Sequence, residues 1–208
     1  MQYSYEGMID KETRNESEMN SNTTTHPDSV INHIVQLQEK FYNKTNKNIF
    51  YKKDQKLDCA NMISQQLDIN ILFEKTLFIL HHGEIYFDYT IFKTYIHPEI
   101  FNDFLEYVNN ISLQYIDKLP TYTLHLNFQS ISISAFERYW PLVRQIINKF
   151  PVNGNKMEKT HIYYTPVIVD QIMKVMNPFI VNFRDKIIFY SKTESPEKIS
   201  ELFSSIHR

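Results

Sequence analysis

Beyond Pro120, short strand patterns alternate with helix patterns, and this order limits the fold more than any other feature of the chain. The expected strands cover residues 121–128, 160–165 and 186–190, and the expected helices cover 135–150, 165–179 and 195–208. Alternating units of this length favour parallel strands joined by right-handed crossovers. We therefore predict an α/β protein, an α/β/α sandwich with a mainly parallel sheet.

The strand at 121–128 has the clearest period in the chain. In "TYTLHLNF", the apolar residues Tyr122, Leu124, Leu126 and Phe128 alternate with Thr123, His125 and Asn127. Successive side chains of a strand point to opposite faces, so this strand should have one strongly apolar face. Two of the expected helices have candidate N-terminal caps. Ser134 stands at the start of the helix at 135–150 and Ser195 at the start of the helix at 195–208, and a serine hydroxyl there can accept a hydrogen bond from the first helical turn.

Three regions are expected along the chain: a disordered tail at 1–27, a helical appendage at 28–70 and the main domain at 71–208. The tail is polar and has no period. The appendage has two helix patterns, one at 29–43 with Asp28 as its cap and one at 57–67.

The main domain begins with an apolar segment at 76–92 that is centred on Gly83. Its β-branched and aromatic residues predict a hairpin or two short strands. Pro98 then opens a helix pattern that extends to residue 118.

Composition and charge narrow the class of protein. A net charge of −2 argues against a general nucleic-acid-binding surface. The single cysteine, Cys59, excludes an intrachain disulfide, fits a reducing compartment and is expected to be a small buried thiol. No run reaches the ~18–20 apolar residues of a membrane span, and the first residues lack a signal-peptide pattern. A cytoplasmic protein is expected.

Catalytic and metal-binding patterns are weak. With only three glycines, the chain contains no phosphate-binding loop motif. His81 and His82 are neighbours near a turn and should point to opposite faces, so they do not form a metal site. His125 and His161 lie in strands and are expected to pack or to form hydrogen bonds. We therefore expect no enzyme activity, no cofactor and no metal.

The helix in "TPVIVDQIMKVMNPF" (165–179) has unusually little polar surface. Asp170, Gln171, Lys174 and Asn177 share roughly a third of its circumference, and most of the remainder is apolar. A surface helix buries a stripe of about 100° or more, so this one is wider than usual. Two explanations stay open from periodicity: a core helix that is covered on both sides, or the wall of a ligand cavity.

Four segments in order resemble the CRAL-TRIO lipid-binding domain family: "LHLNFQSISISAF", "NKFP", "HIYYTPVIVDQIMKVMNPFI" and "RDKIIFYS". This is the fold of cellular retinaldehyde-binding protein and of phosphatidylinositol/phosphatidylcholine transfer proteins. The resemblance covers about the last 90 residues, and more weakly extends back to Phe73. The sequence departs from the family at Asn127, where aspartate is usual, and at Ser130, where glycine is usual, and these departures leave the headgroup open.

The resemblance implies a lipid-binding function. In this family, the helix near 166–177 would be a gate over an apolar cavity that holds a phospholipid or another hydrophobic ligand. Such a protein sequesters or transfers its ligand in the cytoplasm and contacts membranes only transiently. The residues implied to line the cavity are Tyr122, Leu124, Leu126, Tyr164, Ile172, Met173, Met176 and Phe179. Lys186 is the implied phosphate contact, with Arg184 as the weaker candidate.

An interaction module is the alternative. Divergent relatives of this fold act as docking or regulatory domains, and a filled cavity would favour a protein partner over a lipid. The volume beneath the gate helix distinguishes the two readings.

Overall fold

The computed structural model describes residues 27–45, 52–81, 83–149, 156–167 and 169–205. Its helices are α1 Pro27–Lys44, α2 Lys52–Gln66, α3 Ile69–Thr76, α4 Tyr89–Tyr95, α5 Phe101–Gln114, α6 Ile133–Lys149, α7 Val169–Ile180 and α8 Ser195–Ser205. Its strands are β1 Leu77–Ile79, β2 Glu84–Asp88, β3 Tyr122–Asn127, β4 Met157–Tyr163 and β5 Ile187–Phe189. Short 3-10 segments are η1 Pro98–Ile100, η2 Ile116–Lys118 and η4 Val181–Lys186. The predicted tail, except for Pro27, lies outside the described residues.

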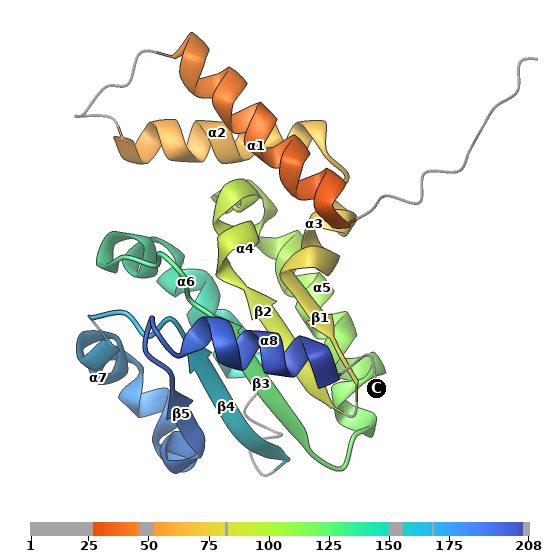
Figure 1. Ribbon diagram of the computed structural model, residues 1–208, viewed down its shortest axis with the longest axis vertical. Helices are drawn as coiled ribbons and strands as arrows, with labels where there is room; N and C mark the ends of the chain where they lie inside the picture. The colour runs from red at the N-terminus through yellow and green to blue at the C-terminus, as the bar shows by residue number, and fades with distance from the viewer. Residues whose placement is uncertain (1–26, 46–51, 82, 150–155, 168, 206–208) are drawn as a thin grey trace, which may run out of the picture.

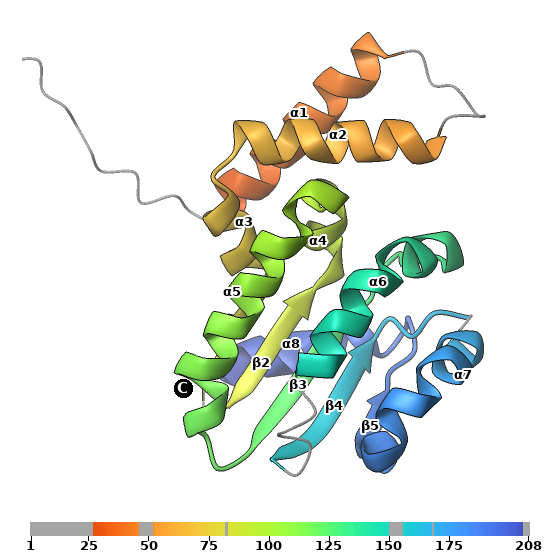
Figure 2. The same ribbon diagram turned by 180° about the vertical axis from the view of Figure 1, so that it is seen from behind.

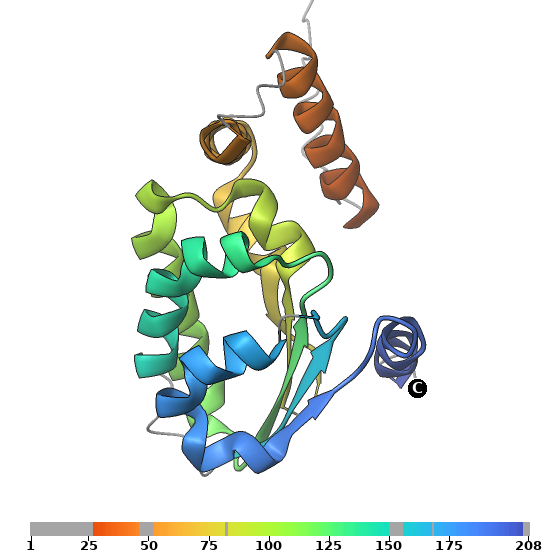
Figure 3. The same ribbon diagram turned by 90° about the vertical axis from the view of Figure 1, so that its left-hand side faces the viewer.

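One five-stranded sheet organises the fold. The strands lie in sequence order, β1-β2-β3-β4-β5; β1 is antiparallel to β2, and the other neighbours are parallel. Helix α8 crosses one face of the sheet (Figure 1), and the view from behind places α5 and α6 over the other face (Figure 2). Figure 3 shows the sheet edge-on, with α7 on the same side as α6. The predicted α/β class and mainly parallel sheet are confirmed.

The main buried cluster lies in the N-terminal three quarters of the chain. It runs from Ile34 in α1 to Met157 at the start of β4, and Phe104 of α5 is completely buried within it. Helix α2 packs on α4 and contributes Cys59, which is 3% exposed, so the expected buried thiol is confirmed. The predicted boundary at residue 70 falls within α3, and the division into appendage and domain stays a prediction.

The hairpin at Gly83 is confirmed, but its second strand is shorter than predicted. Gly83 has φ +83°, and a Cβ there would lie 2.8 Å from the carbonyl oxygen of Thr121, so the turn requires glycine. The strand ends at Asp88 because its side chain accepts a hydrogen bond from the backbone N–H of Thr90 and thereby caps α4. The apolar residues 89–92 are therefore helical, and the prediction of a strand there was wrong.

Three helix caps also differ from the predicted ones. The Ser132 hydroxyl accepts from the N–H of Ala135 at the start of α6, so Ser134 is not the cap. Before α8, Ser191 and Glu194 accept from each other's backbone N–H, which is a capping box. Ser195 instead donates to the carbonyl of Ser191. Helix α1 begins at Pro27, which places Asp28 inside the first turn rather than before it.

The capping box gives a direct stability test. Ser191→Ala should lower the free energy of unfolding by about 1 kcal/mol, because the N–H of Glu194 loses its acceptor at the start of α8. Urea denaturation followed by circular dichroism measures this change. Ser204→Ala, at an exposed position in the last turn of α8, is the matched control. Equal stability of the two variants would contradict the assigned cap.

Candidate functional site

Helix α7 has an apolar surface that the described part of the fold covers only in part. It follows a turn in which Tyr164 has φ +53° and Pro166 is buried. Among the described side chains of α7, only Ile172 is fully buried, at 7% exposed. Val175 is 48% exposed and Met173 is half-buried. The apolar width of this helix is therefore not explained by burial in the core.

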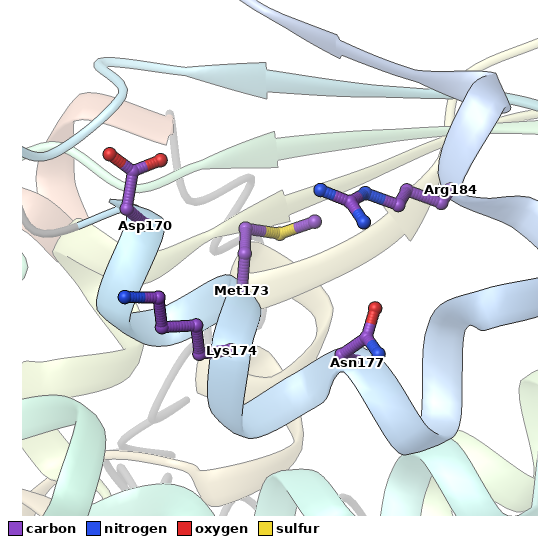
Figure 4. Close-up of a pocket in the computed structure, with 5 residues that line it drawn as sticks. All are labelled: Asp170, Met173, Lys174, Asn177 and Arg184. Carbon is purple, nitrogen blue, oxygen red and sulfur yellow. The ribbon is translucent and has the colours of Figure 1, made fainter.

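A pocket of about 440 Å³ lies between α7 and η4. The described residues that line it are Asp170, Met173, Lys174, Asn177 and Arg184. The side chains of Met173 and Arg184 point toward each other across this space (Figure 4). The pocket thus combines one apolar side chain, Met173, with two cationic groups, of which Arg184 comes from η4 and Lys174 from α7.

The sheet has an incompletely covered apolar face on the side of α7. Tyr86 packs on Phe203 of α8, so its side chain lies on the α8 face of the sheet, as do the residues paired with it on adjacent strands. Because successive side chains of a strand alternate, the residues before and after these in the sequence face the opposite side. Leu126 and Phe189 belong to that opposite side, through the register Leu126–Ile162–Phe189. Leu126 is half-buried and Phe189 is 41% exposed. Apolar surface therefore remains accessible on the sheet as well as on the helix.

A second, smaller hollow of about 220 Å³ lies between α6 and α7. The described residues that line it are Ile133, Phe136, Glu137, Trp140, Gln171, Ile172 and Val175. Ile133 is 46% exposed, which is similar to Val175 on the facing helix. This groove is mostly apolar and opens to the surface.

The predicted cavity residues do not form a single lining. Met173 lines the larger pocket and Ile172 lines the groove, so these two adjacent residues of α7 face two different hollows. Tyr122 is buried in the main cluster at 3% exposed, and Leu124 packs against that cluster.

The remaining predicted residues lie around these hollows. Met176 is half-buried on α7, whereas the side chain of Phe179 lies outside the described part of the structure. The backbone N–H of Tyr164 donates to the Ser195 hydroxyl. Lys186 donates from Nζ to the carbonyl oxygen of Met157 at 2.6 Å, so it secures the start of β4. Of the two predicted cations, Arg184 is the one that lines the pocket.

Sequence reasoning missed a polar network between the sheet and α8. His125 is 4% exposed and bonds through Nε2 to the Glu84 carboxylate and through Nδ1 to the Tyr163 hydroxyl at 2.7 Å. His161 bonds through Nδ1 to the Tyr190 hydroxyl at 2.9 Å. The face of β3 that was expected to be its polar side is therefore more buried than its leucine side.

The rings of this network stack across the strands. The His125 and His161 rings lie 4.9 Å apart at 8°, and Tyr163 lies 5.2 Å from Tyr190 at 12°. Burial lowers the pKa of His161 to about 4, with a further lowering from His125. Burial raises the pKa of the Tyr163 hydroxyl. Both histidines thus form side-chain hydrogen bonds within the network, which confirms the expectation for them. The signal in the sequence was their matching place in adjacent strands.

The described residues contain no group of three or more side chains suited to a metal ion. His82 lies outside the described residues, so the expectation for the His81–His82 pair is not tested by the geometry. No helix in the described ranges is both long and apolar enough to cross a bilayer. No family model matches the chain, and no curated protein matches it.

Proposed function

We propose that this protein binds a hydrophobic ligand beside α7 and belongs to a divergent CRAL-TRIO-like class. The observation that carries the proposal is the accessible apolar surface of α7 next to a pocket of about 440 Å³. This volume lies within the range of small-molecule sites, about 300–1,000 Å³. The half-buried Met173 gives the wall a side chain that can repack around a flexible chain.

The position of α7 supports a gating role. The main buried cluster ends at Met157, so α7 lies outside it and is held chiefly by α6 and η4. Elements with few buried apolar contacts open at lower free energy than the core does. The proposed protein is a cytoplasmic carrier that performs no covalent chemistry and meets a membrane only while α7 is displaced.

Co-purification is the direct test of this function. Mass spectrometry of an organic extract of the purified protein should find a hydrophobic molecule at close to one per chain, or the emptied protein should take up labelled lipid from vesicles. A protein that carries no such molecule and takes up none would overturn the proposal.

Met173→Trp should reduce lipid uptake at least tenfold, because a larger rigid side chain fills the space between α7 and Arg184. Transfer of a labelled lipid between vesicles measures this effect. Val175→Asp is the matched control, since Val175 lies two residues further along α7 but lines the groove toward α6. Unchanged transfer by Met173→Trp, with the fold intact by circular dichroism, would contradict the pocket.

A protein-interaction module is the second candidate, and the α6–α7 groove favours it. Ile133 and Val175 are each close to half-exposed on either side of this groove, which suits an apolar anchor of a partner protein. Under this alternative, Val175→Asp would abolish partner binding while Met173→Trp would leave it unchanged. The two variants therefore separate the two functions.

A further inference from the structure

We infer that the pocket between α7 and η4 takes an amphiphile with one hydrocarbon chain and an anionic head. This inference rests on the proposed function and narrows its ligand class. The pocket holds about 440 Å³. At about 30 Å³ for a group the size of a water molecule or methylene, it accommodates on the order of fifteen such groups. That is one fatty chain, whereas a diacyl lipid needs roughly twice this volume.

The charges that line the pocket select the head. Lys174 and Arg184 supply two cations, and Asp170 supplies one anion, so the lining has a net positive charge. Within the described part of the chain, neither Lys174 nor Arg184 makes a hydrogen bond or an ion pair with another residue. A guanidinium at a pocket wall that has no partner among the described residues is suited to bind a carboxylate or a phosphate with two hydrogen bonds.

The arrangement of Met173 and Arg184 orients the ligand. The two side chains converge on the same space from α7 and from η4 (Figure 4). A molecule between them must present carbon to the thioether and an anion to the guanidinium. Asn177 adds an amide that can donate to the same head. Lys186 is already bonded to the Met157 carbonyl, so Arg184 is the residue expected to set the preference for an anion.

A titration series with the full chain tests the ligand class. The probes are palmitate, 1-palmitoyl lysophosphatidate, hexadecanol, dipalmitoyl phosphatidate and inorganic phosphate, each measured by calorimetry or by displacement of a fluorescent fatty acid. Palmitate and lysophosphatidate should bind at one per chain and at least tenfold more tightly than the other three. A preference between these two would identify the head as a carboxylate or a phosphate.

Arg184→Ala should weaken palmitate and lysophosphatidate at least tenfold and leave hexadecanol within twofold, because only the anion loses its partner. Arg144→Ala, at an exposed site on α6 that does not line the pocket, is the matched control and should change nothing.

The possible failures are distinguishable. Phosphatidate binding as tightly as palmitate would overturn the single-chain inference while leaving the proposed function in place. Hexadecanol binding as tightly as palmitate would overturn the anionic head. Inorganic phosphate binding as tightly as lysophosphatidate would reduce the site to a plain anion site. Absence of binding by every probe would overturn both the inference and the function.

Discussion

Phe104→Ala should lower the free energy of unfolding by about 3–5 kcal/mol, the range for deleting a fully buried aromatic ring. Phe104 has no exposed surface, and its ring lies 5.3 Å from the Phe73 ring and 5.4 Å from the Phe92 ring. These contacts join α3, α4 and α5, so a cavity there would weaken all three helices at once. Urea denaturation followed by fluorescence and circular dichroism measures the loss.

The control for this prediction is Phe101→Ala, on the same helix. Phe101 is only partly buried, and the truncated side chain leaves a space that water can reach. Its loss should be less than half that of Phe104→Ala. Similar losses in the two variants would show that the aromatic cluster is not the centre of the stability of this fold.

Acidification should destabilise the protein through His161. The pKa of His161 in the folded protein is lowered to about 4 from an ordinary value of 6.5. The unfolded chain therefore binds a proton at this residue before the folded protein does, so the stability it contributes is fully present above pH 6.5 and is lost progressively as pH falls toward 4. Because the ring is only partly buried, water screens part of the effect, and we expect a loss of about 2 kcal/mol.

The comparison of variants isolates this titration. Glu84 and Lys159 influence the same ring, and His125 stacks on it, so the total pH dependence includes other groups. His161→Phe keeps a planar ring in the stack and removes the proton-binding nitrogens. This variant should lose less stability than the wild type between pH 6.5 and 4.5, whereas the exposed control His33→Gln should follow the wild type. Parallel curves for His161→Phe and the wild type would refute the assignment.

The strands that followed a clear period were predictable from the sequence, and the ends of elements were not. Alternation located the strand that begins at Tyr122, because the period of two is a property of the backbone itself. The end of β2 depended instead on one side chain. Asp88 caps a helix in a run of residues that otherwise suits a strand, and local hydrogen bonding prevails over β propensity there.

Burial on the two faces of the sheet could not be deduced from the strand pattern. Leu126 lies on the face that was expected to be strongly apolar, yet it is only half-buried, whereas His125 on the other face is 4% exposed. The reason is that α8 packs over the histidine face and α7 leaves the leucine face partly open. The lining of the pocket could not be deduced from the strand pattern either. The conformation of the 3-10 segment η4 places Arg184 at the pocket and Lys186 at the Met157 carbonyl, and no period in the sequence predicts this arrangement.

The strict sequence order of the sheet has a consequence for the time course of synthesis. Each strand pairs with the strand that precedes it in the chain, so β1 to β4 and the main cluster can assemble while the ribosome is still making the remainder. Both walls of the pocket, α7 and η4, are translated after β4. A nascent chain therefore has its main cluster translated before either wall of the pocket, so the proposed ligand site would mature after the core.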